Sequence, residues 1–377
     1  MVMRPVVKRT SWWGVLSVAG VTLAIAWPVA AQDGSAERGR GDHDHDGDHD
    51  HDGGHGGSRC SEVEFSVSLA DDSPDTFRVV GELCVPRGRR ADTLQILIHG
   101  STYNRSYWDF PFQSRRYSYV RHANEAGFAT LAIDRLGSGE SDHPAPELVS
   151  VHGTAHTVHQ IVSAVRSGSH HAADGRRLDF DRIVLVGHSF GSNISWTEAG
   201  IYGDVDGLIL TAISHDMNPP AAPLTQTLSY PAAFDPAFAS AGLPLGYLTT
   251  IPGARDELFY HVPGADPDVI AVDEATKDVL PVGVLFDQFT TYGLTQNIHV
   301  PVLNVVGNFD TLACQLPSCD GSGSIANEGS NYPADADYTQ LIVPEAGHSV
   351  NLHRNAPAWY AQAQHWDHDH VEPHHGY

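Results

Sequence analysis

A serine between two glycines is the strongest chemical signal in the sequence. Residues 187–191 read Gly-His-Ser-Phe-Gly, with Ser189 at the centre. They follow the apolar run 183–186 and precede a helical pattern, which is the strand–turn–helix context of a nucleophile elbow. A serine hydroxyl is a weak nucleophile until a neighbouring base takes its proton, so this motif calls for a base elsewhere in the chain. The alternative is a serine that merely caps the following helix.

An aspartate and a histidine follow Ser189 in the chain order of such a triad. Asp310 ends the turn Gly-Asn-Phe-Asp after the apolar run 300–306, and His348 follows Ala-Gly after the run 340–343. Turns at these places lie at the carboxyl edge of a parallel sheet, where open α/β folds hold their active sites. Asp310 is therefore predicted to orient His348, which would act as the base. Asp216, at the end of an earlier apolar run, is the alternative acid.

Short apolar runs alternate with helical patterns from residue 60 onward. The strand-like runs are 96–98, 129–133, 183–186, 208–211, 300–306 and 340–343. The helix-like stretches are 117–125, 149–166, 192–202 and 355–365. Strands that are apolar throughout are typical of a parallel sheet buried on both faces. The alternation predicts a doubly wound α/β sheet.

One interval interrupts this alternation. Residues 216–296 contain no clear parallel strand and are rich in Pro, Leu, Phe and Tyr. An unstructured loop of that length is uncommon in a compact domain. We predict a helical cap over the carboxyl edge of the sheet, where it would shape an apolar pocket. The alternative is an extension of the core with no role in substrate binding.

A second motif gives the chain a family resemblance. His-Gly-Ser at 99–101 ends the strand at 96–98, as the motif at 187–191 ends another. With these motifs the chain resembles the serine-type α/β-hydrolase superfamily, and in particular secreted esterase-like and lipase-like members with a cap. The resemblance implies the α/β-hydrolase fold, with a mostly parallel central sheet, helices on both faces and an inserted helical cap. It also implies an oxyanion hole made by the backbone N–H groups of Ser101 and Phe190, and a structural turn at 134–141.

The predicted activity is the cleavage of a carboxylic ester or a related acyl compound through an acyl-enzyme, without a cofactor. The substrate would be a small molecule or lipid-like. Within the resemblance, a serine at the elbow speaks against relatives that use aspartate there, such as dehalogenases and epoxide hydrolases. Amide or peptide cleavage on the same fold is one alternative. The other is a non-catalytic exported protein that binds metal.

Charge and the first residues bear on location and partners. The chain has 46 acidic and 22 basic residues in 377, a formal charge of -24, which argues against a nucleic-acid partner. Residues 1–31 are predicted to be a signal peptide, with basic residues, an apolar stretch at 12–26 and small residues before the cleavage site. The protein would then be secreted or periplasmic, without stable membrane insertion. An uncleaved membrane anchor is the alternative.

Four cysteines in an exported chain suggest disulfides. Cys60 and Cys84 lie at the outer ends of two strand-like runs, 62–70 and 76–83, and a hairpin would bring them together. Cys314 and Cys319 lie five residues apart in a loop. The predicted pairs are therefore Cys60–Cys84 and Cys314–Cys319.

Histidines outside the triad suggest metal binding only weakly. Residues 32–58 form an Asp/His/Gly-rich tract with nothing to bury, and we expect it to be disordered. Its weak metal candidates are His43, His45, His49 and His51. The domain is predicted at 59–365, with a second His-rich tail at 366–377. Neither tract has the spacing of a closed four-ligand site, so any divalent metal there would be adventitious.

Two further groups of residues were ambiguous in the sequence. His152, His156 and His159 share one face of the helix predicted at 149–166. We expect that face to be exposed, and a metal site is the alternative. Tyr103 and Trp108 follow the turn at 99–101, where they would either line the pocket or pack in the core.

Overall fold

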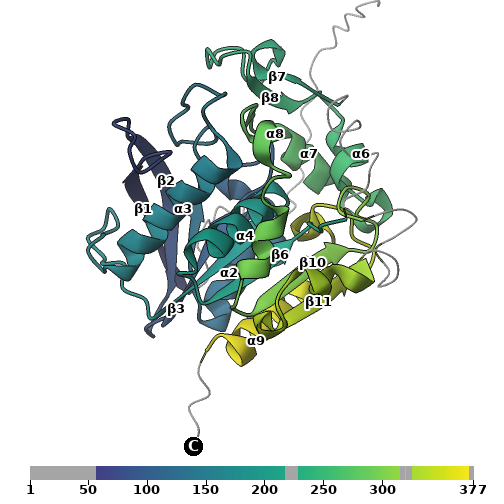
Figure 1. Ribbon diagram of the computed structural model, residues 1–377. Helices are drawn as coiled ribbons and strands as arrows, with labels where there is room; N and C mark the ends of the chain where they lie inside the picture. The colour runs from purple at the N-terminus through teal and green to yellow at the C-terminus, as the bar shows by residue number, and fades with distance from the viewer. Residues whose placement is uncertain (1–56, 217–227, 315–318, 320–324, 373–377) are drawn as a thin grey trace, which may run out of the picture. The chain divides into compact units, whose positions relative to one another are not determined.

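A computed structural model describes residues 57–216, 228–314, 319 and 325–372, and these residues form an eight-stranded sheet with helices on both faces (Figure 1). The strands lie in the order β1-β2-β4-β3-β5-β6-β10-β11. Their bounds are β1 Ser58–Val67, β2 Phe77–Pro86, β3 Thr93–Ile98, β4 Ala129–Ile133, β5 Arg182–His188, β6 Gly207–Thr211, β10 Val302–Gly307 and β11 Tyr338–Val343. From β4 to β11 all neighbours are parallel, whereas β1 and β2 are antiparallel to their neighbours. The predicted mostly parallel sheet is confirmed.

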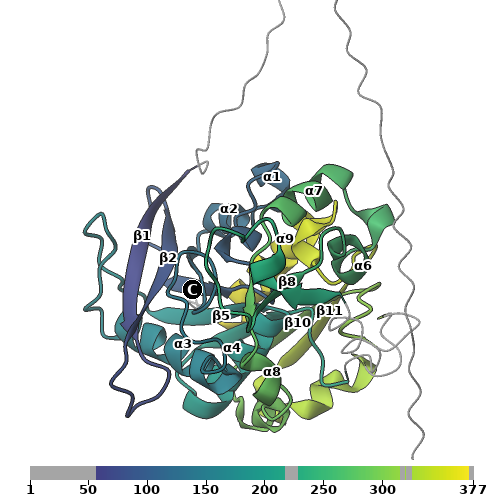
Figure 2. The same cartoon turned by 90° about the horizontal axis from the view of Figure 1, so that it is seen from above.

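Helices cover the two faces of the sheet in separate groups (Figure 2). One face carries α3 (Val151–Arg166) and α4 (Phe190–Tyr202), which pack against each other. The other carries α2 (Tyr119–Ala126) and α9 (Ala356–His370), with α1 (Ser114–Tyr117) beside them. Successive strand residues point to opposite faces, so Ile96 and Ile98 join one apolar core and Leu97 the other. Both cores need apolar side chains, which is why these strands are apolar throughout.

Local signals in the sequence fix where these helices begin and end. The Ser118 hydroxyl accepts a hydrogen bond from the Arg121 amide at the start of α2, and Ser150 does the same for the Gly153 amide at the start of α3. Gly127, with φ of 113°, ends α2 in a left-handed conformation that favours glycine. The described residues also form seven short 3-10 helices. They are η1 Arg105–Tyr107, η2 Ala232–Phe234, η3 Val262–Gly264, η4 Tyr292–Asn297, η5 Ile325–Asn331, η6 Ala334–Ala336 and η7 Val350–Leu352.

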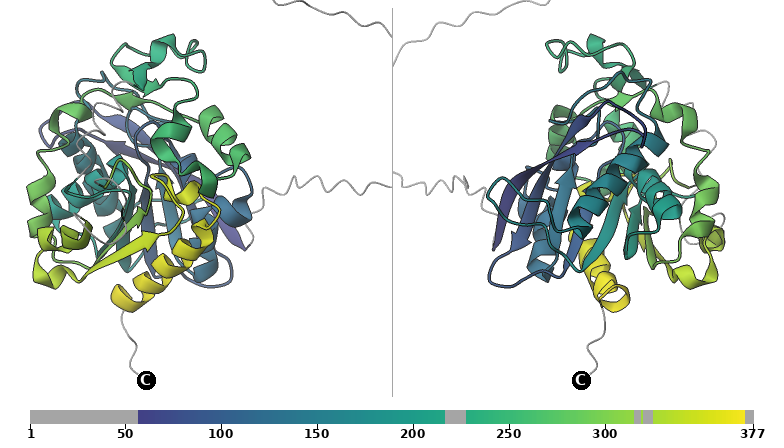
Figure 3. Two further views of the ribbon diagram at one scale, coloured as in Figure 1. Left: turned by 90° about the vertical axis from the view of Figure 1, so that its right-hand side faces the viewer. Right: turned by 60° about the vertical axis from the view of Figure 1, so that its left-hand side comes forward.

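Residues 228–297, here called the inserted segment, follow β6 and precede β10 along the chain. They are the green segment in Figure 3. The segment contains the short helices α6 Arg255–Phe259, α7 Pro267–Ala275 and α8 Val284–Asp287. It also contains a three-stranded antiparallel sheet of β7 Ser229–Pro231, β8 Tyr247–Thr250 and β9 Leu280–Pro281. The sequence predicted helices only. Strands of two to four residues are too short to produce a recognisable alternation of polar and apolar residues.

The last helix is longer than the sequence suggested. α9 continues to His370, five residues past the predicted domain boundary at 365. Trp366 and Asp367 are buried, and Asp367 accepts a hydrogen bond from Gln95 of β3. The dense His and Asp content of this stretch masks the buried face of the helix in the sequence.

The predicted signal peptide, the tract with His43 to His51 and residues 373–377 lie outside the described residues.

Both predicted disulfides are present. Cys60 and Cys84 are directly opposite each other on β1 and β2, with Cα atoms 4.0 Å apart, so the bridge closes the hairpin near its open end. Cys314 and Cys319 are joined in the loop after β10.

Among the helices of the described residues, none has the length and apolar character needed to cross a bilayer.

Candidate active site

Ser189 lies in the sharp turn between β5 and α4. Its φ of 52° and ψ of -113° are a strained combination for a residue with a side chain. The turn is tight enough to require both flanking glycines. A Cβ on Gly191 would lie 2.0 Å from the carbonyl oxygen of Ile98, and one on Gly187 would lie 2.5 Å from the Ser192 amide nitrogen. The glycines therefore allow this turn, and the turn places Ser189 at the carboxyl end of its strand.

The structure brings the three predicted residues together. His348 Nε2 lies 2.7 Å from Ser189 Oγ, and His348 Nδ1 lies 3.0 Å from each carboxylate oxygen of Asp310. An ionised carboxylate can only accept hydrogen bonds, so the N–H at Nδ1 of His348 donates a hydrogen bond to Asp310. Nε2 is then the ring nitrogen with a free lone pair, and it accepts the hydrogen bond from the serine hydroxyl. The imidazole is thus placed to take the proton of Ser189.

Backbone amides hold the acid in place. Asp310 is buried in the turn after β10, and its Oδ1 accepts hydrogen bonds from the amides of Leu312 and Ala313 at 3.0 and 2.9 Å. Asp216, the alternative acid, is exposed. The carboxylate in contact with His348 is that of Asp310.

The turn after β3 lies beside the serine turn. Ser101 and Phe190 both line the pocket that contains Ser189. Phe190 is the first residue of α4, where amides have no acceptor within the helix. The N–H groups of Ser101 and Phe190 belong to turns at the ends of neighbouring strands, β3 and β5. The two residues predicted as oxyanion donors therefore lie on neighbouring turns beside the same pocket.

A buried arginine fixes the peptide that bears the Ser101 amide. Arg135, only 1% exposed, donates hydrogen bonds to the carbonyl oxygens of His99 and Gly100 at 3.1 and 3.0 Å. In a trans peptide the N–H points away from the preceding C=O, so holding the Gly100 carbonyl also sets the direction of the Ser101 N–H. His99 Nε2 in turn accepts a hydrogen bond from the Arg135 amide and lies 3.0 Å from the Ser138 hydroxyl oxygen. Burial, and then the charge of Arg135, lowers the pKa of His99 well below its usual value, which keeps the ring neutral.

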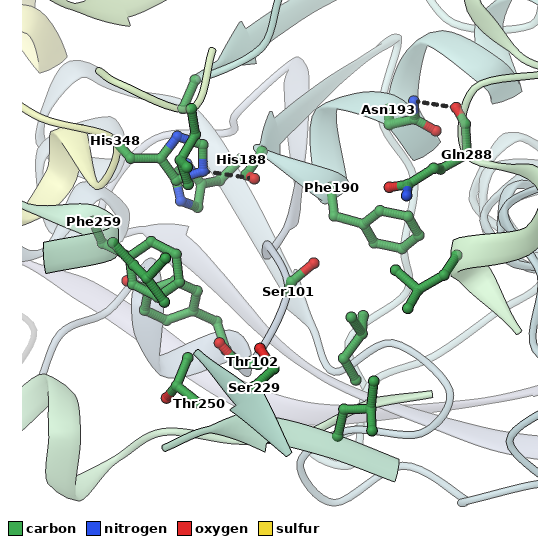
Figure 4. A pocket seen from close by; sticks show the side chains of 18 of the residues that line it. Ser101, Thr102, His188, Phe190, Asn193, Ser229, Thr250, Phe259, Gln288 and His348 are labelled. Atoms are coloured by element: carbon green, nitrogen blue, oxygen red, sulfur yellow. Dashed lines mark hydrogen bonds between the residues drawn. The ribbon is translucent and has the colours of Figure 1, made fainter. Parts of the chain in front are cut away.

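The pocket beside Ser189 is a largely apolar cavity of about 380 Å³ (Figure 4). The loops after the strands supply one side of it and the inserted segment supplies the other. Its apolar lining from the inserted segment includes Tyr230, Pro231, Leu248, Leu258, Phe259, Leu280, Leu285, Phe289 and Tyr292. Asn193, Ser229, Thr250 and Gln288 are among the polar residues of the lining. Tyr103 lines the pocket, whereas Trp108 is fully buried and packs against Tyr119.

A buried ion pair beneath the pocket was not found from the sequence. Arg255 and Asp273, each 1% exposed at the side chain, form two hydrogen bonds of 2.9 Å across the inserted segment. Arg255 also donates to Thr102, the residue after Ser101, and lies over the Tyr103 ring at 4.3 Å. Tyr260 donates to Asp273 at 2.8 Å. The pair therefore ties the inserted segment to the turn after β3.

The histidine face of α3 differs in part from the expectation. His152 is exposed and pairs with Asp287, as a surface residue does. His156 is buried, and its Nδ1 lies 2.9 Å from the Tyr202 hydroxyl of α4. His159 is partly buried beside two carboxylates. The face is therefore covered over much of its length, because α4 packs against α3.

Comparisons with known proteins identify the family and agree with the fold. The sequence model of the alpha/beta hydrolase family matches residues 95–363, and the chain belongs to that family. Epoxide hydrolase 3 from Xenopus tropicalis is 30% identical over 149 residues, which are 39% of this chain. The match spans only 34% of that relative's length.

Solved structures share the fold at low sequence identity. An esterase from Thermogutta terrifontis superposes with a TM-score of 0.56 at 16% identity, over 82% of this chain and 99% of the other. Monoglyceride lipase from Saccharomyces cerevisiae gives 0.56 at 15% identity, over 82% and 97%. These likenesses concern the fold, and the family assignment identifies the chain as a hydrolase.

Proposed function

We propose that this hydrolase cleaves carboxylic esters or related acyl compounds with Ser189 as the nucleophile. The observation that carries the proposal is the 2.7 Å contact between Ser189 Oγ and an imidazole whose other nitrogen is held by a buried carboxylate. In the first step Ser189 Oγ bonds to the carbonyl carbon while His348 takes the hydroxyl proton. The C–O bond to the leaving group then breaks, and His348 gives its proton to the departing alcohol. The product of this step is an ester of Ser189.

The second step restores the enzyme. His348 removes a proton from water, the hydroxide oxygen bonds to the acyl carbon, and the bond to Ser189 Oγ breaks as the serine regains the proton. Negative charge develops on the carbonyl oxygen in both steps. The N–H groups of Ser101 and Phe190 would donate hydrogen bonds to this oxygen, and one such donor typically contributes about 3–4 kcal/mol of transition-state stabilisation. Asp310 stabilises the imidazolium that forms each time.

The lining of the pocket favours an apolar acyl group. Most of the side chains that the inserted segment contributes are apolar, and burying each methylene of a substrate there contributes about 0.8 kcal/mol. An esterase and a monoglyceride lipase are among the structures that share the fold. A small or lipid-like ester is the substrate class that these observations support.

The similarity to an epoxide hydrolase raises a second reaction, the opening of an epoxide. In the epoxide-hydrolase pattern the nucleophile at the elbow is an aspartate, and here that position holds Ser189. A serine in hydrogen-bond contact with a histidine is arranged for attack on an acyl carbon. The residue at this one position is our reason for proposing acyl transfer. Amide cleavage by the same steps is the other candidate.

The proposal is tested with p-nitrophenyl esters of graded chain length. We expect hydrolysis that a chelator leaves unchanged, that a serine-directed phosphonate abolishes, and that falls by several orders of magnitude in Ser189→Ala. Asp310→Asn should lower kcat by about 10⁴, as loss of the acid does in related triads. Asp216→Asn is the matched control and should retain activity. Full activity in the Ser189→Ala variant, or opening of a styrene oxide probe without ester cleavage, would contradict the proposal.

We also propose that the protein is exported after removal of residues 1–31. The two disulfides support an oxidising location, since cytosolic proteins keep their thiols reduced. N-terminal sequencing of the protein recovered outside the cytoplasm should begin at Gln32. A start at Met1 would instead indicate a retained anchor.

A further inference from the structure

A histidine and two carboxylates meet away from the active site, at the C-terminal end of α4. His159 belongs to α3, Glu198 to α4, and Asp204 follows the end of α4. His159 Nδ1 lies 2.7 Å from Asp204 Oδ2 and 3.8 Å from Glu198 Oε1. One possible ligand atom from each of the three residues lies within 4.8 Å of the other two. We call these three residues the α3–α4 cluster.

Glu198 is the unusual member of this cluster. Its side chain is 0% exposed, and neither of its carboxylate oxygens has a hydrogen-bond partner among the described residues. Oδ1 of Asp204 is likewise buried without a partner. Buried carboxylate oxygens without a hydrogen-bond donor are unfavourable unless a cation or a shared proton compensates them.

We propose that the α3–α4 cluster binds a divalent transition-metal ion such as Zn²⁺. An imidazole nitrogen and two carboxylate oxygens are ligands that such ions accept, with water completing the coordination. The metal would replace the proton that His159 Nδ1 now shares with Asp204. The ring of His159 is already held in place, because it stacks on Tyr202 with ring centroids 3.8 Å apart. The site also lies at the negative end of the α4 dipole, which favours a cation.

A comparison within the molecule supports this choice of cluster. Cys60, Glu82 and Cys84 form the other group with suitable spacing among the described residues. Both of those cysteines are in a disulfide and have no thiolate to offer. At the α3–α4 cluster no ligand group is in a covalent bond, and only the hydrogen bond between His159 and Asp204 would have to give way.

The site would stabilise the fold and take no part in the reaction. Glu198 lies nine residues after Ser189 on the same helix, about 13 Å along its axis. A metal ion there would join α3 to the far end of the helix that begins at the serine. Because the ion binds only the folded protein, it should raise the unfolding temperature and leave kcat unchanged.

The test is a zinc titration of the full chain after removal of metal with a chelator, followed by thermal unfolding. We expect Tm to rise by about 5 °C at a zinc concentration one hundred times Kd. His159→Ala and Glu198→Gln should each abolish that rise. His152→Ala is the matched control, because His152 lies exposed on the same helix and pairs with Asp287 instead. That variant should keep the full response.

Metal content separates this site from the histidine-rich tracts. Zinc held by the tracts alone would appear in the metal analysis of every variant without moving Tm, and that result would overturn the proposal. A zinc-dependent rise in Tm that survives in Glu198→Gln would overturn it as well. A wild type whose Tm does not change with zinc would also overturn it. If Glu198→Gln were then more stable than the wild type, Glu198 and Asp204 would simply share a proton. Ester hydrolysis is not a readout here, so these outcomes are independent of the proposed function.

Discussion

The buried pair of Arg255 and Asp273 offers a sharp test of how the inserted segment supports the site. Replacing Asp273 with Ala removes the acceptor of two 2.9 Å hydrogen bonds from Arg255 and of a third from Tyr260. Arg255 remains in a space where its side chain is 1% exposed. Burial by itself lowers the pKa of Arg255, but in the intact pair the Asp273 carboxylate outweighs that effect and raises it. The guanidinium in the variant would therefore be a buried charge without its partner.

The magnitude follows from that uncompensated charge. Breaking a buried ion pair by removing one partner typically costs about 3–5 kcal/mol, a large share of the roughly 5–15 kcal/mol that stabilises a domain. Replacing both partners with apolar residues leaves no unpaired charge. The double variant Arg255→Met/Asp273→Leu should therefore be more stable than Asp273→Ala, although it contains two substitutions.

The assay is urea unfolding combined with ester turnover. Asp273→Ala should lose about 3–5 kcal/mol in the free energy of unfolding. The double variant should recover much of this loss but stay slow, because Thr102, beside Ser101, no longer receives the Arg255 hydrogen bonds. Loss of one well-placed oxyanion donor lowers kcat by about 10²–10³, which sets the upper limit on that slowing. A double variant less stable than Asp273→Ala would refute the reasoning, and so would one with wild-type turnover.

Three further predictions follow from single features of the structure. Arg135→Met should lower kcat by at least about tenfold with little change in KM, because the Gly100 carbonyl loses its donor and the Ser101 N–H loses its fixed direction. An unchanged kcat would show that the turn at 99–101 keeps its conformation without Arg135. Burial raises the pKa of Asp367 to about 7, so the folded protein holds this proton more tightly than the unfolded chain does. The free energy of unfolding should therefore fall as the pH rises from about 4 to about 7. In unfolding curves measured over this pH range, Asp367→Asn should lack this decrease and should be more stable than the wild type at pH 8. Replacing Cys60 and Cys84 together with Ala should cost about 3 kcal/mol by releasing a constraint across 24 residues, as measured by urea unfolding, whereas an unchanged midpoint would mean that β1 and β2 pair as firmly without the bridge.

Much of the fold was predictable because its signals are local. Strands buried on both faces have to be apolar throughout, so the runs that became β3 to β6, β10 and β11 were visible in the sequence. Ser189, Asp310 and His348 were also visible, since each follows a strand and lies at its carboxyl end. The ends of parallel strands meet at one edge of the sheet, and no further knowledge of the packing was needed to bring these residues together.

The features that were missed depend on contacts between distant segments. Arg255 and Asp273 look in the sequence like two ordinary surface charges, and only the folding of the inserted segment buries them together. Arg135 lies in a turn that the sequence marked as structural, but its two carbonyl partners come from another strand end. Glu198 occupies a helix position where a glutamate is usually solvated, and it is buried because α3 lies over it. Burial of a polar side chain by a neighbouring element leaves no periodic signal.

The missing side chain of Gly191 has a consequence for how this enzyme can change. The backbone of the serine turn touches the carbonyl oxygen of Ile98, at a distance that leaves no room for even a methyl group. Contact between backbone atoms therefore sets the distance between the two turns that carry Ser101 and Phe190, and this contact involves no side chain. The apolar side chains that residues 228–297 contribute to the pocket can therefore be exchanged to accept other substrates while the two turns keep their separation, provided that Arg255 and Asp273 are kept. The apolar lining and the spacing of the two turns are thus set by different parts of the chain, which meet where Arg255 contacts Thr102.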